Sequence, residues 1–276
     1  MRGALPRANR TGRWTRAMNE PRILRIDPSG PPDAGLAPIS DLTPDMLEEG
    51  SPVELAHDYY TSPSGVLTAG VWECTPHRTH FMRYPVDEFM LLLEGAVTIV
   101  HEGGHEETFH RGEAFVIPRG LHCAWKQTQT VRKIYMILDD PSHPIPEKPV
   151  AERAIRLERN GPAGIGLAPL VLPNSSLFQG APPKQHDHTY FVNATGQLNA
   201  GVWTCTPMQR KPLPFPRTEL MCLLEGSVTL TDGEGVAHTF RAPDVFFVPY
   251  GVVNAWSSTE NVRKFYCIFE EPGAEE

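Results

Sequence analysis

The chain has 276 residues and a net charge of −8; 40% of its residues are hydrophobic and 21% are charged. This length is enough for one large domain or two domains of roughly 130 residues, and the hydrophobic fraction excludes a disordered chain. The acidic balance argues against nucleic acid, whose phosphates need Lys and Arg, and no apolar run approaches the roughly 20 residues that span a bilayer.

The first 22 residues differ in composition from the rest of the chain. Residues 1–22 hold six arginines and a single acid, Glu20. They lack the apolar core of a secretory signal, so we predict a disordered N-terminal arm over 1–22 and a cytoplasmic protein with no membrane partner.

After the arm, the pattern is that of β-strands. Residues 43–48 predict one short helix, because Pro44 and acids form its first turn. In the run 88–93 both alternating faces are mainly apolar, and Glu94-Gly95 then turns the chain. Strands with two apolar faces belong to a barrel or sandwich that a second layer covers. Further strands are expected over 97–100, 114–117 and 131–138.

The second half of the chain repeats the first half without a gap, 131 residues later. GVLTAGVWECTP (65–76) aligns with GQLNAGVWTCTP (196–207), DEFMLLLEGAVTI (87–99) with TELMCLLEGSVTL (218–230), and VRKIYMI (131–137) with VRKFYCI (262–268). A period this long indicates two whole domains rather than a solenoid. We predict barrels over 23–145 and 153–276, joined by a Pro-rich linker over 146–152.

The five cysteines are odd in number and form no Cys-x-x-Cys pair. Most lie in apolar, strand-like runs, so reduced and buried thiols in a cytoplasmic protein are expected. They are Cys74, Cys123, Cys205, Cys222 and Cys267.

Two short motifs in each half resemble those of the cupin superfamily. Glu88-FMLLLE-Gly95 and Glu219-LMCLLE-Gly226 match the Glu-x6-Gly half of the first cupin motif, Gly112-EAFVI-Pro118-Arg-Gly120 matches the front of the second, and Ala242-PDVFFV-Pro249-Tyr-Gly251 is a degraded copy of it. The AW…VRK-x-Y tails are typical of the branch that includes ureidoglycine aminohydrolases and ethanolamine-utilisation proteins. The resemblance covers residues 23–271. It implies an all-β fold of two tandem cupin barrels (double-stranded β-helices, or jelly rolls) that arose by internal duplication.

In cupins, two histidines of the first motif, its Glu and a histidine of the second motif converge on Mn, Fe, Ni or Zn. Proline at two of these positions in the second repeat offers no donor atom, so we expect a degenerate second site. The first-repeat positions hold Phe81 and Arg83 (in the alternative register Met82 and Tyr84), Glu88 and Cys123; the second-repeat positions hold Pro212 and Pro214 (or Leu213 and Phe215), Glu219 and Asn254.

Metal binding in the first barrel stays open at this point. A shifted site from His80, Glu88 and either His122 or Cys123 would bind Mn, Zn or Fe, for which neutral imidazole is a good ligand. The alternative is that these histidines lie at the surface or rim and that the barrel holds no cofactor. Strand alternation places His122 on the face opposite Cys123, so the two cannot both face the interior without a bulge.

A carboxylate inside a barrel needs a partner. For Glu88 and Glu219 the candidates are Arg83 and the lysines Lys133 and Lys264. Either a buried ion pair replaces the metal, or a Glu and an Arg bind a small polar ligand. We predict Glu88 and Arg83 as catalytic residues, and Phe81, Tyr84, Cys123 and Lys133 as the ligand pocket. The repeat-equivalent tryptophans Trp72, Trp125, Trp203 and Trp256 are expected to pack in the core or between the barrels.

Two classes of function remain open. The residues favour a bicupin that binds a small polar metabolite in the first barrel, largely without the usual cupin metal. The resemblance implies a metal-dependent hydrolase similar to (S)-ureidoglycine aminohydrolase, which acts on a ureide or a similar small nitrogen compound. In either case we expect a small-molecule ligand and a monomer that imitates a cupin dimer, with a higher homo-oligomer left open.

Overall fold

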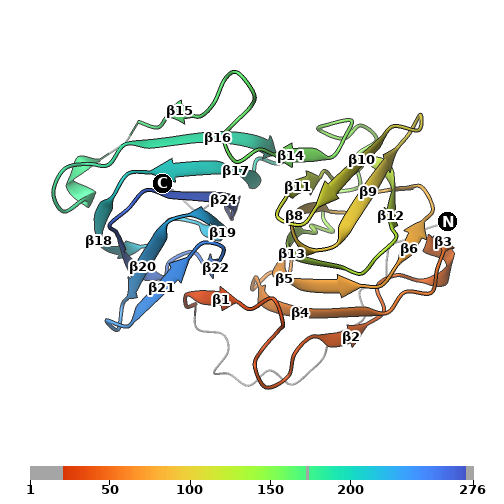
Figure 1. The fold of residues 1–276 in the computed structure, drawn as a ribbon, viewed down its shortest axis with the longest axis horizontal. Helices are drawn as coiled ribbons and strands as arrows, with labels where there is room; N and C mark the ends of the chain where they lie inside the picture. Colours follow the sequence, from red (N-terminus) through yellow and green to blue (C-terminus); the bar gives the residue numbers. More distant parts are fainter. Residues whose placement is uncertain (1–20, 172–173, 272–276) are drawn as a thin grey trace.

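The computed structural model describes residues 21–171 and 174–271, so most of the predicted arm 1–22 lies outside the described residues. Within them the chain forms two β-barrels side by side (Figure 1). The predicted all-β fold of two tandem cupin barrels is confirmed. The short helix predicted over 43–48 is a single 3₁₀ turn, η2 (Pro44–Met46), because Leu47 already returns to extended backbone.

Barrel 1 is built from two antiparallel sheets. Its inner sheet has seven strands in the order β14-β11-β8-β13-β5-β4-β2, and its outer sheet has the order β10-β9-β12-β6-β3 with β7 added beside β12. The strands are β2 (Ala37–Ile39), β3 (Leu47–Glu49), β4 (Glu54–Thr61), β5 (Leu67–Cys74), β6 (His77–Thr79), β7 (Met82–Arg83), β8 (Asp87–Glu94), β9 (Ala96–His101), β10 (Glu106–His110), β11 (Ala114–Ile117), β12 (His122–Gln127), β13 (Val131–Leu138) and β14 (Ile155–Leu157).

Barrel 2 repeats this arrangement. Its inner sheet has the order β1-β22-β19-β24-β17-β16-β15, and its outer sheet has the order β18-β23-β20-β21. A second 3₁₀ turn, η3 (Ser175–Leu177), lies where η2 lies in barrel 1. The strands are β1 (Leu24–Ile26), β15 (Ala168–Pro169), β16 (Gln185–Val192), β17 (Leu198–Cys205), β18 (Met208–Pro214), β19 (Thr218–Glu225), β20 (Ser227–Asp232), β21 (Ala237–Arg241), β22 (Val245–Val248), β23 (Val253–Ser258) and β24 (Val262–Phe269).

The first strand of each repeat belongs to the sheet of the other repeat. Strand β1 pairs with β22, with Leu24 opposite Phe247. Its repeat equivalent β14 pairs with β11, with Ile155 opposite Val116. The predicted segments 23–145 and 153–276 therefore exchange their first strands, which ties each barrel to the other by backbone hydrogen bonds.

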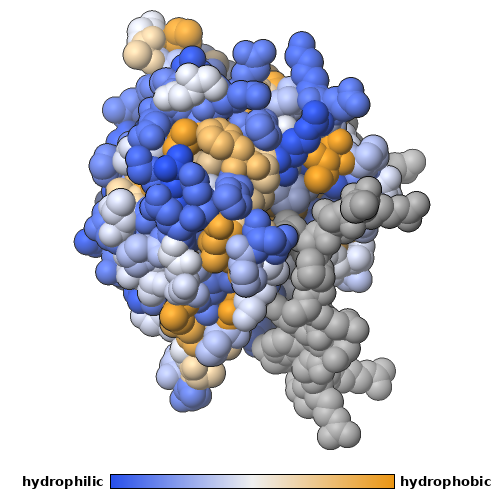
Figure 2. Space-filling model, turned by 90° about the vertical axis from the view of Figure 1, so that its right-hand side faces the viewer, coloured by the Kyte–Doolittle hydropathy of each residue, from blue (hydrophilic) through white to orange (hydrophobic). Residues whose placement is uncertain are grey.

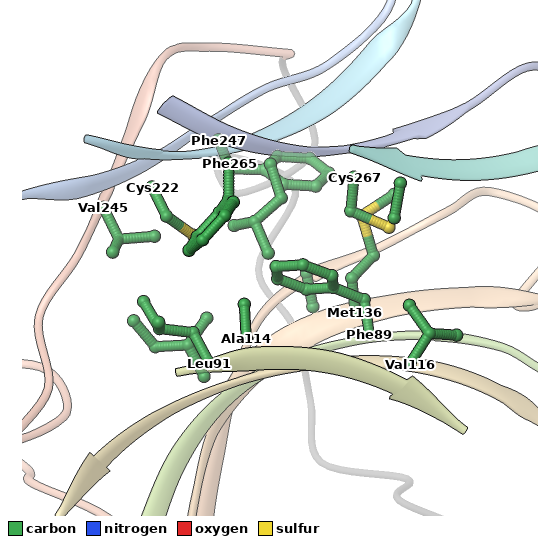
Figure 3. Close-up of a cluster of buried hydrophobic side chains, with 14 of the residues drawn as sticks. Phe89, Leu91, Ala114, Val116, Met136, Cys222, Val245, Phe247, Phe265 and Cys267 are labelled. Carbon is green, nitrogen blue, oxygen red and sulfur yellow. The ribbon is translucent and has the colours of Figure 1, made fainter. Parts of the chain in front are cut away.

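The two inner sheets pack face to face and share one hydrophobic core (Figure 3). Phe89 and Leu91 on β8 point toward Phe247 and Cys267 of barrel 2, while the alternate residues Met90 and Leu92 point into barrel 1. This explains why the run 88–93 is apolar on both faces: one face lines a barrel and the other lines the interface between the barrels.

The predicted turn after this strand is confirmed in both repeats. Gly95 and Gly226 have φ near +77°, a left-handed conformation that favours glycine. A Cβ at Gly95 would also lie 2.2 Å from the Thr130 carbonyl oxygen, so another side chain would force the backbone apart.

The face of barrel 1 that Figure 2 shows is mostly hydrophilic, with small hydrophobic groups between polar side chains. All five cysteines are free and buried, as expected. No helix in the described part of the chain has the length and apolar character needed to cross a membrane.

Candidate functional site

Barrel 1 contains a buried ion pair between β8 and β13. Glu88 is 4% exposed and Lys133 is 6% exposed. The Lys133 side chain passes Met90, whose Sδ lies 3.3 Å from Nζ, and reaches Glu88 Oε1 at 2.9 Å. Burial of a carboxylate is tolerated here because a charged donor of the neighbouring strand pairs with it.

Tyr84 is the second partner of Glu88. Its hydroxyl donates a hydrogen bond to Oε2, so both carboxylate oxygens are bound. Burial, reinforced by the nearby Glu88 charge, raises the pKa of Tyr84 well above its usual value. Tyr84 therefore stays protonated and acts as a hydrogen-bond donor.

Two tryptophans flank the ammonium group of Lys133. The Nζ atom lies 4.7 Å from the ring of Trp72 and 4.7 Å from the ring of Trp125, and the two rings meet edge to face at 6.0 Å. Both distances are in the range of cation–π contacts. The rings therefore hold the lysine between them, and the predicted role of the tryptophans as packing residues is realised within each barrel.

The tryptophans are themselves oriented by polar side chains. Trp72 Nε1 donates to Glu54 Oε1 at 3.2 Å, and the other Glu54 oxygen accepts from the Leu42 amide at 2.8 Å. Trp125 Nε1 donates to Gln127 Oε1 at 2.7 Å. Glu54 and Gln127 were not predicted as site residues. The signal available for Glu54 was its alignment with Gln185, a polar residue in the same position of the repeat.

Cysteine and histidine side chains near this pair are not reactive groups. Burial raises the pKa of Cys123 to about 12, so its thiol stays protonated. His77 is buried with Nδ1 3.0 Å from the Thr75 carbonyl oxygen, and burial lowers its pKa. His77 is therefore neutral at physiological pH.

Several predicted site residues lie away from Glu88. Arg83 is exposed, and its Nη1 lies 3.4 Å from the Pro146 carbonyl oxygen, so the predicted contact between Arg83 and Glu88 is wrong. The reason is strand alternation: Arg83 pairs with His122 in register and faces outward, whereas Met82 pairs with the inward-facing Cys123. Phe81 is also exposed and lies with Arg83 at the rim of the barrel cavity.

The donor set of barrel 1 does not fit a transition metal. Among the described residues, no group of three His, Cys, Asp or Glu side chains converges. His80 is exposed, and His122 points to Glu102, 3.5 Å away, rather than to Glu88. A cation at Glu88 would also face the Lys133 ammonium, which already occupies one carboxylate oxygen.

Barrel 2 keeps the same central pair. Lys264 Nζ lies 2.5 Å from Glu219 Oε1 and 4.8 and 5.5 Å from the rings of Trp203 and Trp256. Burial lowers the pKa of Lys264, and the Glu219 charge opposes that shift.

The surroundings of the pair differ between the barrels. Phe215 replaces Tyr84, so Glu219 lacks the hydroxyl donor that Glu88 has. Asn254 replaces Cys123, and its Oδ1 accepts a hydrogen bond of 2.5 Å from Arg210, a residue that replaces Thr79. The predicted residues of the second site, Glu219 and Asn254, are thus both buried in barrel 2 but bind different cations.

One connected cavity of about 3090 Å³ is lined by both barrels. A cavity for a single small ligand measures roughly 300–1,000 Å³, so this one has room for a ligand in each barrel. Its walls include both lysine–glutamate pairs and all four tryptophans.

Comparison with known proteins agrees with the duplication. The model of the EutQ-like cupin domain matches residues 61–135 and again 192–266. No curated protein matches the chain. A solved structure from Pseudomonas syringae pv. tomato, a DUF861-family protein of unknown function, is similar with 25% identity and a TM-score of 0.72, covering 90% of this chain and 100% of that one.

Two more distant structures share the fold alone. The protein Ylba from E. coli, also of the DUF861 family, has 11% identity and a TM-score of 0.53, with 92% of each chain covered. A cupin 2 conserved barrel domain protein from Leptotrichia buccalis has 10% identity and a TM-score of 0.52, covering 82% of this chain and 100% of that one.

Proposed function

Because the chain belongs to the EutQ-like cupin family, we propose that it is a bicupin that binds a small polar metabolite in barrel 1 without a transition metal. The observation that supports the proposal is the state of Glu88, the residue of barrel 1 that matches a cupin metal ligand. Both of its oxygens are bound by donors of the chain itself, Lys133 and Tyr84. An ammonium group thus supplies the positive charge that a metal would bring.

The buried pair and the Tyr84 hydroxyl together define the class of ligand for barrel 1. A ligand that enters between Glu88 and Lys133 must offer a donor to the carboxylate and an acceptor to the ammonium, since leaving either charge unpaired is costly. Ureides and amides carry both functions on one planar group. The rings of Trp72 and Trp125 supply flat walls for such a group.

A neutral ureide is a suitable probe for this proposal, because it carries no charge through which it could bind at another site. We expect hydantoin or allantoin to bind to the metal-free protein in isothermal titration calorimetry. Glu88→Gln should weaken binding by about tenfold, because the ligand donates to the Glu88 carboxylate and a hydrogen bond to a charged group contributes about 1.5–3 kcal/mol. Tyr84→Phe removes the donor that orients Glu88 and should weaken binding less than Glu88→Gln; it is a mild change, because barrel 2 has Phe215 in the equivalent position. The matched control is Glu219→Gln in barrel 2, which should leave ureide binding unchanged.

Elemental analysis of the same preparations separates this proposal from a metal-dependent hydrolase similar to ureidoglycine aminohydrolase. Stoichiometric Mn, Fe or Zn that is lost in Glu88→Gln and kept in Glu219→Gln would contradict the metal-free binding site and support the hydrolase. Binding of the ureides that is insensitive to both Tyr84→Phe and Glu88→Gln would place their site outside barrel 1.

A further inference from the structure

Barrel 2 contains a cation that has no counterpart in barrel 1. Arg210, on β18, is half-buried and lines the cavity, whereas the equivalent Thr79 of barrel 1 accepts a hydrogen bond from the Trp125 amide. The printed sequence already shows this exchange, because residues 79 and 210 align in the gapless repeat.

The guanidinium of Arg210 is held by a neutral partner. Its Nη2 donates to the carbonyl oxygen of Asn254 at 3.1 Å and to the side-chain Oδ1 at 2.5 Å. In the described part of the chain no carboxylate lies within ion-pair distance of Arg210, and the nearby Glu219 is already paired with Lys264 at 2.5 Å. The remaining nitrogens of the guanidinium group have no protein hydrogen-bond partner within the described residues.

Burial makes this arrangement unfavourable without an anion. It lowers the pKa of Arg210, and the charge of Glu219 only partly opposes that shift. An arginine stays protonated even so, which means that barrel 2 carries a partly desolvated positive charge. An anionic ligand would offset the cost of that desolvation.

The rest of the wall suits a small organic anion. Phe215 lies 5.8 Å from the Arg210 guanidinium, and the rings of Trp203 and Trp256 meet edge to face at 5.9 Å. Arg217, exposed where barrel 1 has Val86, adds a second positive charge to the cavity wall. Acids on the cavity wall oppose these charges: Asp187 on β16, whose pKa is raised by burial, the paired Glu219, and Glu270 and Glu271 after β24.

We propose that barrel 2 is a second binding site, which takes a small monocarboxylate whose carboxylate group pairs with Arg210. The planar, forked guanidinium matches the two oxygens of a carboxylate. A single interior cation without an ion pair balances one negative charge, which favours a monoanion over a dianion. This site does not depend on the ligand of barrel 1, where the interior cation Lys133 is already paired.

Three acids and their uncharged amides test the proposal by calorimetry at constant ionic strength. The probes are acetate, lactate and benzoate, with acetamide, lactamide and benzamide as matched controls. We expect at least one acid to bind while its amide does not. Arg210→Thr, which installs the barrel 1 residue, should weaken binding of that acid by about tenfold or more, because a charge-assisted pair is lost.

Two variants serve as controls. Asp187→Asn should leave carboxylate binding unchanged or strengthen it, since it removes a negative charge from the facing wall. Tyr84→Phe, in barrel 1, should leave it unchanged. Gln185→Glu places an acid where barrel 1 has Glu54, and it should weaken carboxylate binding by repulsion. This second variant keeps the test decisive if Arg210→Thr does not fold.

The proposal is overturned if none of the three acids binds to the wild type, or if their binding survives Arg210→Thr or Gln185→Glu unchanged. Loss of binding in Tyr84→Phe would place the carboxylate in barrel 1 instead, and loss in Asp187→Asn would show that Asp187 rather than Arg210 holds the probe. Failure of this test would leave ureide binding in barrel 1 intact, so the two proposals fail separately.

Discussion

Barrel 1 and barrel 2 hold the same buried lysine–glutamate pair between the same two tryptophans, yet they complete the pair with different chemistry. In barrel 1 a tyrosine hydroxyl binds the free oxygen of the carboxylate. In barrel 2 that hydroxyl is absent, and an arginine and an asparagine occupy the neighbouring space.

This difference distinguishes the residues that stabilise each barrel from the residues that select its ligand. Residues that are equal in both repeats, such as Glu88 and Glu219, maintain the interior of each barrel and give no reason for the barrels to bind different ligands. Exchanges such as Tyr84 to Phe215 and Thr79 to Arg210 change the donors and the charge that face the cavity. We therefore expect ligand specificity to depend on these exchanges, and stability to depend on the shared pair.

The largest expected effect comes from separating the barrels. A chain cut between the exposed residues Glu147 and Lys148 should give two fragments that aggregate when produced alone, because each would expose its half of the shared core and lack one strand. Produced together, the fragments should copurify as a 1:1 complex in size-exclusion chromatography. Two monomeric fragments that each fold alone would show that the exchanged strands and the shared core are dispensable.

The next largest effect concerns the shared pair. Lys133→Met and Lys264→Met should each lower the free energy of unfolding by about 3–5 kcal/mol, because a buried carboxylate is left without its cation. Urea denaturation measures the change. The double variants Lys133→Met/Glu88→Gln and Lys264→Met/Glu219→Gln should recover part of it, and more in barrel 1, where Tyr84 can still donate to residue 88. A loss below about 1 kcal/mol in one barrel would show that its pair is not desolvated.

A smaller effect is expected from the hydroxyl that distinguishes the barrels. Tyr84→Phe should cost about 1.5–3 kcal/mol of unfolding free energy, because a hydrogen bond to a charged carboxylate is removed. The reverse change, Phe215→Tyr, offers Glu219 the same donor and should not destabilise the protein. If Phe215→Tyr proves as destabilising as Tyr84→Phe, the interiors of the two barrels differ in shape and not only in hydrogen bonding.

The response to acid should also differ between the barrels. The pKa of His77 is lowered below its usual 6.5, so the unfolded chain binds a proton there before the folded protein does. The stability that depends on neutral His77 is therefore fully present above pH 6.5. The free energy of unfolding falls as the pH drops below that value, because the unfolded chain binds the proton more tightly. His77→Met, which installs the barrel 2 residue Met208, should reduce the loss of stability between pH 7 and pH 5 in thermal denaturation. An unchanged pH profile would assign that loss to other groups, such as the buried His101.

The smallest effect is expected at the rim of barrel 1. Arg83→Ala should change the free energy of unfolding by less than about 0.5 kcal/mol, because the side chain is exposed and makes one hydrogen bond to a carbonyl oxygen. Thermal denaturation is sufficient to measure this. A decrease in the free energy of unfolding as large as that of Lys133→Met would indicate that Arg83 does pair with Glu88.

The local pattern was enough to predict much of the site. The gapless repeat predicts two equivalent barrels, alternation places Glu88 inside, and Lys133 was a candidate partner on the strand after the second motif. The sequence pattern left two registers open for residues 81–84. In the structure, Met82 and Tyr84 face inward. That choice depends on how β7 pairs with β12 of the outer sheet, which no pattern within 81–84 can show.

The sequence by itself determined the duplication, the all-β character, and the absence of cupin ligands at Cys123, at Asn254 and, in either register, at the histidine positions of the first motif, because these follow from residue identity and spacing. Only the tertiary structure decided which side chains meet across the barrel: Tyr84 and Lys133 on Glu88, Arg210 on Asn254, and β1 on β22. The physical reason is that alternation along a strand fixes a side chain to one face of its sheet. Its partner on that face comes from strands that are distant in the chain, and closure of the barrel brings them together.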